Sequence, residues 1–250
     1  MRLLLEEADA VRSRFARGGP VLVALDYDGT LTEIIDDPKD PALRPQRRQV
    51  LARVPGPGRW LAVVSGRALA DVRARIGIER AIYVGNHGLE IAAPGLVRRF
   101  APPGTEDRLS ALLASLPLTD AVVVENKTLT ATLHVRPRDD DRRHAALGEA
   151  VQGAVEAAGF VLRPGKASWE IRPADAPDKG DAIRCLIDSL PGAGPERTVY
   201  IGDDATDEDA FLALPEAVTA RVGPPGVATA ARYRLPDPAA VYRFLEMLTG

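Results

Sequence analysis

Short, mostly apolar runs alternate along this chain with segments of helical periodicity. The apolar runs lie at 21–25, 60–64, 81–84, 198–201 and 217–222. Runs of this length indicate strands buried on both faces, as in a parallel sheet that helices cover on either side. Helices are expected at 3–17, after Pro45, and at 68–76, 179–190 and 238–249. The sequence therefore predicts an α/β fold with a parallel sheet.

The middle of the chain has a different pattern, typical of a smaller α+β unit. Strands are expected at 122–125, 128–135, 160–162 and 168–171, with one helix at 139–158. The second of these strands alternates threonine or histidine with apolar residues, which predicts one more polar sheet face. We expect an inserted domain at 98–172, and a core domain made of 1–97 and 173–250.

Charge and cysteine content exclude several classes of protein. The 250 residues carry a net charge of −3, so neither nucleic acid nor an acidic membrane surface is expected as a partner. Cys185 is the only cysteine, which excludes an intramolecular disulfide and a cysteine-based zinc site. The N-terminus lacks a signal-peptide core, and no apolar run approaches the ~20 residues of a membrane helix. We expect a cytoplasmic protein.

Two acidic motifs directly follow predicted strands. Asp26-Tyr27-Asp28-Gly29-Thr30 follows the first run, and the acidic stretch 202–209 follows the run at 198–201. The carboxyl ends of parallel strands are where such folds bind ligands. Asp26 and Asp28 suit a nucleophile and a metal site, and Asp203 and Asp204 suit a hard cation such as Mg²⁺. Turn capping and helix N-terminal charge are the structural alternatives, above all for 207–209.

Two weaker motifs occupy similar positions. Ser65-Gly66-Arg67 follows the run at 60–64, where a hydroxyl can bind a phosphate oxygen or simply cap a helix. Lys179 begins a predicted helix, a position that the helix dipole disfavours for a cation. Either an anion lies nearby or the lysine is solvated. Lys39, Lys127, Lys166 and Lys179 are the only lysines among 32 basic residues, so some of them are expected where a compact ammonium is required.

Together these four strand-end motifs resemble the haloacid dehalogenase superfamily of aspartyl phosphotransferases. The resemblance implies a Rossmann-like core with an α+β cap, in which Asp26 is the nucleophile and Asp28 the general acid and base. It further implies that Ser65 and Lys179 hold the phosphoryl oxygens. Mg²⁺ would bind the Asp26 carboxylate, the Asp28 backbone carbonyl and Asp203, with Asp204 and Asp207 next to it.

Four further motifs indicate one family within this superfamily. They are Gly85–Glu90, Val124–Lys127, Leu133–Arg136 and Gly165–Pro173, each of which reads singly as ordinary loop or strand-edge polarity. With the acidic stretch 202–209 they resemble the trehalose-6-phosphate phosphatase family over nearly the whole chain. The resemblance implies sugar contacts from the insert and the core, through Glu125, Asn126, Lys127, Lys166 and Glu170, and through Arg67, Asn86 and His87.

The implied activity is Mg²⁺-dependent hydrolysis of trehalose 6-phosphate by a monomer that acts on a small molecule. The chain departs from the family pattern at Thr128, where relatives often have glycine or another small residue, and at Val135. Alternatives are another sugar phosphate, such as sucrose phosphate or mannosylglycerate phosphate, a sugar phosphomutase, or a non-catalytic sensor of sugar phosphates.

Overall fold

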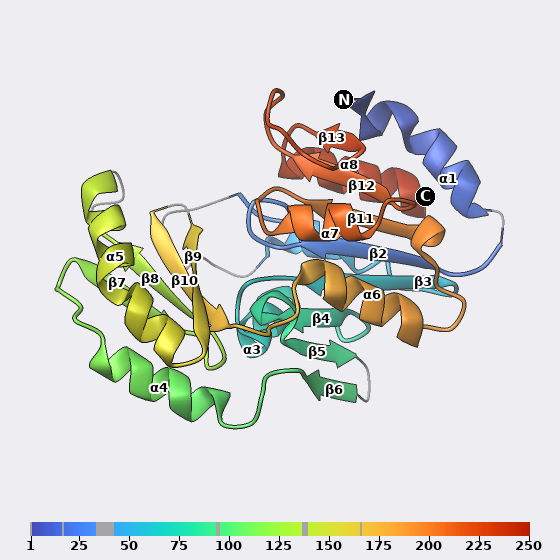
Figure 1. Cartoon of the computed structure of the whole chain (residues 1–250). Helices are drawn as coiled ribbons and strands as arrows, with labels where there is room; N and C mark the ends of the chain where they lie inside the picture. The colour runs from blue at the N-terminus through green and yellow to red at the C-terminus, as the bar shows by residue number, and fades with distance from the viewer. Residues whose placement is uncertain (1, 17, 34–42, 94–95, 137–139, 166) are drawn as a thin grey trace. The chain divides into compact units, whose positions relative to one another are not determined.

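A computed structural model describes the chain except for residues 1, 17, 34–42, 94–95, 137–139 and 166. Lys39 and Lys166 therefore lie outside the described residues. The chain divides into two compact units, one formed by residues 1–98 and 177–250 and the other by residues 99–176. We call them the core unit and the insert unit, and each contains its own sheet (Figure 1).

The core unit is built on a sheet with the strand order β1-β13-β12-β11-β2-β3-β4-β5-β6. The strands are β1 (Arg2–Leu3), β2 (Val21–Asp26), β3 (Arg59–Val64), β4 (Ile82–Gly85), β5 (Glu90–Ala93), β6 (Leu96–Arg99), β11 (Thr198–Gly202), β12 (Val218–Val222) and β13 (Tyr233–Leu235). Neighbouring strands from β1 to β4 in this order are parallel, and β5 pairs antiparallel with β4. Each predicted apolar run lies in one of the parallel strands, so the prediction of a parallel sheet is confirmed.

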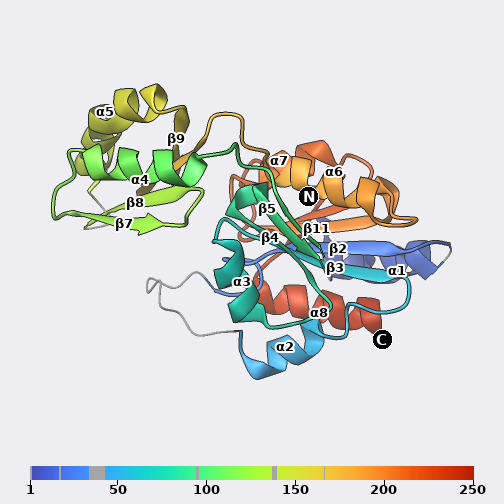
Figure 2. The same cartoon turned by 90° about the horizontal axis from the view of Figure 1, so that it is seen from below.

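Helices cover both faces of this sheet (Figure 2). They are α1 (Ala8–Ala16), α2 (Pro45–Leu51), α3 (Leu69–Ile76), α6 (Lys179–Ser189), α7 (Asp207–Ala213) and α8 (Pro238–Thr249). On β2, Val21, Val23 and Leu25 pack in the apolar cluster of α1, α2, α3 and α8. The alternate residues Leu22 and Ala24 pack in the cluster of α6 and α7. Both faces of β2 are buried, which is why its sequence is continuously apolar.

Some core elements differ from the prediction. The expected helix at 3–17 begins instead with β1 and a 3₁₀ turn at Leu4–Glu7, and α1 starts only at Ala8. The sequence analysis missed β5, β6 and β13, which have only three or four residues each. Strands this short carry too little periodicity to be distinguished from loops.

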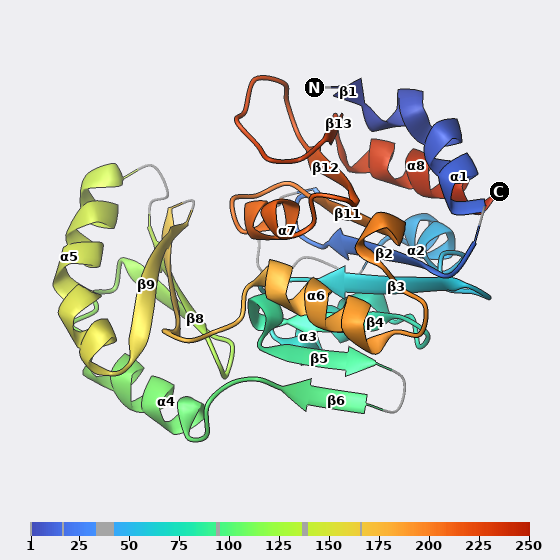
Figure 3. The ribbon, with the colours of Figure 1, turned by 45° about the vertical axis from the view of Figure 1, so that its right-hand side comes forward.

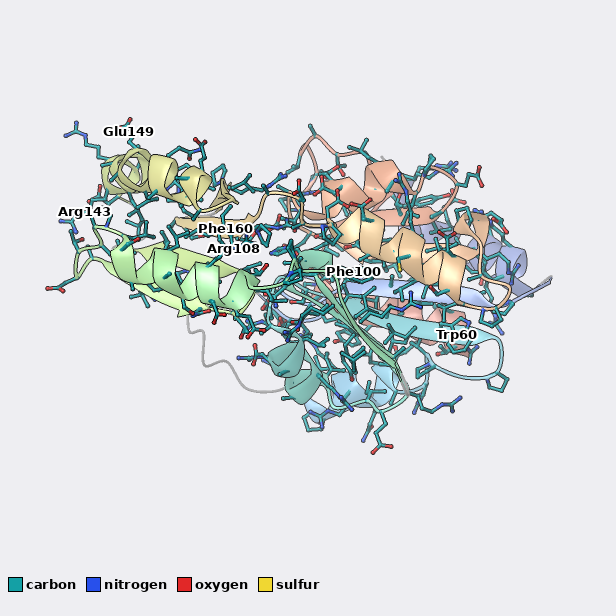
Figure 4. All side chains as sticks on the ribbon, turned by 60° about the horizontal axis from the view of Figure 1, so that its bottom comes forward. Trp60, Phe100, Arg108, Arg143, Glu149 and Phe160 are labelled. Carbon is teal, nitrogen blue, oxygen red and sulfur yellow. The ribbon has the colours of Figure 1, made fainter. Side chains whose placement is uncertain are left out.

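The insert unit is an antiparallel sheet in the order β7-β8-β10-β9, with two helices packed on one face (Figure 3). Its elements are α4 (Thr105–Ser115), β7 (Val122–Asn126), β8 (Ala131–Val135), α5 (Asp141–Ala157), β9 (Phe160–Gly165) and β10 (Ser168–Pro173). Side chains from α4, α5, β8, β9 and β10 form one apolar cluster. Arg108 of α4 lies over the Phe160 ring, 5.8 Å from its centroid (Figure 4). The sequence analysis missed α4.

The register of the insert sheet defines a polar face. Ala131, Leu133 and Val135 of β8 belong to the apolar cluster, so the alternate residues of β8 point away from the helices. Thr132 pairs with Glu125 of β7 and with Glu170 of β10, which places these three side chains in one row on that second face. The predicted polar face of this strand is thus present.

Within the described part of the chain, no helix is both long and apolar enough to cross a bilayer.

Candidate active site

Three adjacent strands bring the predicted motifs of the core unit together. β2 lies between β11 and β3, and all three run in parallel (Figure 3). Asp26 is the last residue of β2, Ser65 directly follows β3, and Asp203 directly follows β11. Because the carboxyl ends of parallel strands share one edge of a sheet, these side chains gather at a single place.

Lys179 enters the same place from the start of α6. A capping box between Asp178 and Asp181 fixes the beginning of this helix. The Lys179 ammonium donates to Asp26 Oδ1 at 2.8 Å and to Asp207 Oδ1 at 2.7 Å, and only 3% of its side chain is exposed. A solvated lysine is therefore excluded, and the anions that offset the helix dipole are these two carboxylates.

Asp207 is fully buried, and donors bind both of its oxygens. Oδ1 accepts from Lys179 and from the Tyr200 hydroxyl, and Oδ2 accepts from the amides of Asp203 and Asp204 at 2.9 and 3.0 Å. Burial opposes ionisation, but Lys179 and the other donors outweigh it and hold the pKa of Asp207 below its usual value. Asp207 therefore organises the loop after β11 and orients Lys179.

Asp26 and Asp203 have far fewer partners. Burial raises the pKa of Asp26 well above its usual value, and burial together with Asp207 raises the pKa of Asp203 to about 7. Among the described residues, Asp26 Oδ2 is buried and has no hydrogen-bond partner. Oxygens of Asp26, Asp203 and Asp207 lie within 4.8 Å of one another. One ammonium cannot neutralise three carboxylates, so this group fits a metal ion, with Asp26 and Asp203 as the available ligands.

Gly29 allows the Asp26–Thr30 loop to approach Asp203 closely. Its φ is +86°, and a Cβ at this position would lie 2.1 Å from Asp203 Oδ2. The Thr30 hydroxyl donates to Asp203 Oδ1 at 3.2 Å. The loop that carries Asp28 is thereby tied to the end of β11.

The turn after β3 is built around Ser65. Its Oγ accepts from the Arg67 amide at 3.1 Å, and its carbonyl accepts from the His87 amide at 3.0 Å. The His87 ring lies over Gly66, where a Cβ would come within 2.2 Å of Nε2. Ser65 is buried beside Asp26 at the same sheet edge, in the position predicted for a phosphate-binding hydroxyl.

Arg67 pairs with the second aspartate of the first motif. Its Nε donates to Asp28 Oδ2 at 2.7 Å and its Nη2 donates to Asp28 Oδ1 at 2.6 Å. A third donor, Nη1, reaches Asp71 Oδ2 at 3.1 Å. Arg67 is predicted to be a substrate ligand, and in this structure it pairs with the predicted general acid and base.

Asn86 and His87 form a strained loop after β4. Both residues have positive φ, at 49° and 56°. The Asn86 side chain is fully buried and donates from Nδ2 to Glu90 Oε2 at 2.9 Å. Asn86 thus supports the loop from within, while His87 covers the Ser65 turn.

In the insert unit, Glu125, Lys127 and Glu170 lie on the polar face of the sheet. Glu125 Oε2 lies 3.0 Å from His134 Nε2, and Lys127 Nζ lies 3.9 Å from Glu170 Oε1. The Asn126 side chain accepts from the Thr128 amide at 2.8 Å, and Thr128 has a φ of +76°. This turn ends β7, so β8 starts at Ala131 and the predicted start at residue 128 was wrong.

A model of the trehalose-phosphatase family matches residues 24–238, which is most of the chain. The chain belongs to this family. Trehalose-phosphate phosphatase of Mycobacterium marinum is 34% identical over 262 residues, covering 91% of the chain and 61% of the relative. Trehalose-phosphate phosphatase B of Arabidopsis thaliana is 32% identical over 253 residues, covering 93% of the chain and 67% of the relative. The chain thus spans about three fifths to two thirds of these relatives.

A solved structure shares the fold of this trehalose-phosphatase family member. The C-terminal domain of trehalose-6-phosphate phosphatase from C. albicans superimposes with a TM-score of 0.79 at 22% identity, and the match covers 97% of the chain and 96% of that domain. The predicted α/β fold of the haloacid dehalogenase type is confirmed, as is the resemblance to the family.

Four residues at or near these sites escaped the sequence analysis. Tyr200, Thr30 and Asp71 contact predicted site residues of the core unit, and His134 contacts Glu125 in the insert unit. Three of them left a signal in the sequence. Asp71 is four residues after Arg67, and Thr30 and His134 belong to motifs already noted. Tyr200 lies inside an apolar run, where nothing in the sequence indicates that its hydroxyl binds a carboxylate.

Proposed function

We propose that the chain is a Mg²⁺-dependent phosphatase that hydrolyses trehalose 6-phosphate to trehalose and phosphate. The main support for this proposal is the environment of the Asp26 carboxylate. Asp26 stands at the carboxyl end of β2 with Oδ1 bound by Lys179 and with Oδ2 buried but lacking a hydrogen-bond partner among the described residues. An oxygen held in this way is prepared to attack an electrophile rather than to stabilise the fold.

In the first step, Asp26 attacks phosphorus and the bond from phosphorus to the sugar oxygen breaks. Asp28 supplies the proton that the departing sugar oxygen takes up. Ser65 and Lys179 donate to the phosphoryl oxygens, whose negative charge would otherwise repel Asp26. In the second step, Asp28 removes a proton from water, which attacks phosphorus and releases phosphate from Asp26.

The carboxylates of Asp26 and Asp203 and the backbone carbonyl of Asp28 are proposed to hold Mg²⁺. All three offer oxygen ligands, which this ion prefers. When bound, Mg²⁺ would offset negative charge on the phosphoryl group and on the two carboxylates. Asp204 and Asp207 lie next to these ligands, and Asp207 fixes the loop through the Asp203 and Asp204 amides.

Sugar recognition is assigned to the polar face of the insert sheet. Glu125, Lys127 and Glu170 lie there, and each can form several hydrogen bonds with sugar hydroxyls. Asn126 is proposed to contribute through its backbone, and Lys166 lies outside the described residues. From the core unit, Arg67 and His87 are the proposed sugar contacts, while the burial of Asn86 favours a supporting role in the loop.

The test is phosphate release from a panel of sugar phosphates, with Mg²⁺ and with EDTA. We expect release from trehalose 6-phosphate that stops in EDTA. Release from sucrose phosphate or mannosylglycerate phosphate alone would assign another substrate, and interconversion of hexose phosphate isomers without net release would assign a mutase. Binding without turnover would indicate a sensor. A cytoplasmic location and a monomeric state stay predictions.

A further inference from the structure

Arg67 lies between two carboxylates of the core unit. It donates through Nε and Nη2 to both oxygens of Asp28, and through Nη1 to Asp71 Oδ2 at 3.1 Å. Asp71 stands in the first turn of α3, where Arg75 Nε donates to both of its oxygens at 2.9 Å. The guanidinium also lies over the Tyr27 ring, 5.6 Å from the centroid. A flat cation supported on a ring in this way can rotate between two acceptors.

The pairing of Arg67 with Asp28 affects the reaction proposed above. General acid catalysis requires one Asp28 oxygen within hydrogen-bond reach of the departing sugar oxygen. Arg67 occupies both oxygens, at 2.7 and 2.6 Å, in the bidentate geometry that is strongest for this pair. A proton on either oxygen weakens the acceptor that Arg67 uses there, so proton transfer through Asp28 is favoured when Arg67 releases one of the two oxygens. A guanidinium that loses one partner needs another, because only 18% of its side chain is exposed.

We propose that Asp71 is a positioning residue for Asp28, the second acceptor onto which Arg67 shifts when Asp28 enters the reaction. Asp71 is suited to this because it already accepts one hydrogen bond from Arg67 and because Arg75 holds it in place. Its own side chain is 41% exposed. The inference rests on the proposed function, since it concerns the acid that protonates the leaving group.

Leaving-group chemistry separates this role from a structural one. A sugar alkoxide needs a proton as its bond to phosphorus breaks, whereas p-nitrophenolate leaves without one. We expect Asp71→Asn to lower kcat on trehalose 6-phosphate roughly 3- to 10-fold, a small part of the ~10²–10⁴-fold that general acid catalysis contributes, with little change in KM. The single-turnover rate of p-nitrophenolate release from p-nitrophenyl phosphate should equal that of the unmodified protein. Asp71→Glu, which restores the carboxylate, should recover most of the lost kcat.

Glu79→Gln is the matched control, because Glu79 is exposed just after α3 and its loss changes the net charge equally. Asp71→Ser is prepared as a second variant. Of Asp71→Ser and Asp71→Asn, the one whose melting temperature equals that of the unmodified protein is used for the kinetic assays. Unchanged kcat on trehalose 6-phosphate, or an equal loss of p-nitrophenolate release, would overturn the role of Asp71. Failure of the unmodified protein to hydrolyse any phosphomonoester would instead overturn the proposed function.

Discussion

The Lys179–Asp26 pair of the core unit and the Glu125–His134 pair of the insert unit differ in their exposure to solvent. In the core unit, Lys179 and Asp26 have side chains that are 3% and 6% exposed, and every partner is another part of the site. In the insert unit, Glu125 and His134 lie on an open sheet face with side chains 39% and 26% exposed. A buried charge that loses its partner destabilises the folded protein, whereas water can solvate a half-exposed charge in place of the lost partner. We infer that substitutions at Lys179 or Asp26 disturb the whole core site, while substitutions at Glu125 or His134 have local effects; Lys127 and Glu170, which are 12% and 14% exposed, are intermediate.

The strongest test of the constrained core is Asp26→Asn. We expect a loss of at least ~10³-fold in phosphate release from every phosphomonoester, because the amide is not a nucleophile. The melting temperature in EDTA should stay the same or rise, since the substitution removes a carboxylate whose ionisation burial disfavours. Asp107→Asn, at an exposed carboxylate of α4, is the control. Residual turnover near that of the unmodified protein would refute the assignment of the nucleophile.

Lys179→Arg tests whether the core accepts even a conservative change. The larger, planar guanidinium must fit between two carboxylates that each approach the ammonium within 2.8 Å. We expect a loss of roughly 10²-fold in phosphate release and a loss of about 1–3 kcal/mol in the free energy of unfolding. Phosphate assays and urea denaturation measure the two effects. A fully active, equally stable variant would mean that a compact ammonium is not required at this position.

Lys127→Ala tests the more buried pair of the insert site, Lys127 and Glu170. We expect kcat/KM for trehalose 6-phosphate to fall roughly 10- to 100-fold through the loss of hydrogen bonds to the sugar. Turnover of p-nitrophenyl phosphate should be unaffected. The melting temperature should fall, because the Lys127 and Glu170 side chains are only 12% and 14% exposed and lie 3.9 Å apart. Arg142→Ala removes the same charge from an exposed position of α5 and serves as the control. Equal losses on both substrates would contradict a role confined to sugar recognition.

The pH dependence of stability tests how burial affects the ionisation of the core site. Burial and Asp207 raise the pKa of Asp203 to about 7, above the ~3.9 of an unfolded aspartate. The folded state then binds more protons than the unfolded state between about pH 4 and pH 7, so its stability falls as the pH rises through this window. We expect the melting temperature in EDTA to fall from pH 5 to pH 7.5. Excess Mg²⁺ should reduce that fall, and an equal fall with and without Mg²⁺ would contradict metal binding at Asp203.

The smallest expected effect concerns the strained turn of the insert unit. Thr128 is β-branched and has a φ of +76°, a conformation that glycine adopts without steric cost. We expect Thr128→Gly to raise the free energy of unfolding by about 1 kcal/mol, less the added entropy of the unfolded chain. Thr119→Gly, at a threonine without positive φ, should not stabilise the protein. A lower melting temperature for Thr128→Gly would show that the Thr128 side chain stabilises the protein by more than its positive φ costs.

Most of the core was predictable from sequence because its strands are buried on both faces. The runs at 21–25 and 198–201 are buried throughout, and each is followed by aspartates that the structure brings together. The partners within the site were harder to predict. Asp207 was expected next to a metal, yet its contacts with Lys179 and Tyr200 depend on where α6 and β11 meet in space.

The pairing of Arg67 with Asp28 could not be predicted from the sequence either. Arg67 and Asp28 are 39 positions apart and follow different strands, and either one alone suits a substrate ligand. Only the parallel pairing of β2 and β3 makes them neighbours. The residues at the ends of strands were thus predictable, but the pairs that they form were not.

The pairing of Asp26 with Lys179 also bears on how the protein is made. The two residues are separated by 153 positions, and the whole insert unit lies between them. At about 5–20 residues per second, a ribosome would synthesise Lys179 roughly 8–30 s after Asp26. Until then β2 also lacks β11, its neighbour on one side, and exposes that edge. Until residues 179–202 emerge, the nascent chain therefore lacks the Asp26–Lys179 pair and has an unpaired β2 edge that favours aggregation.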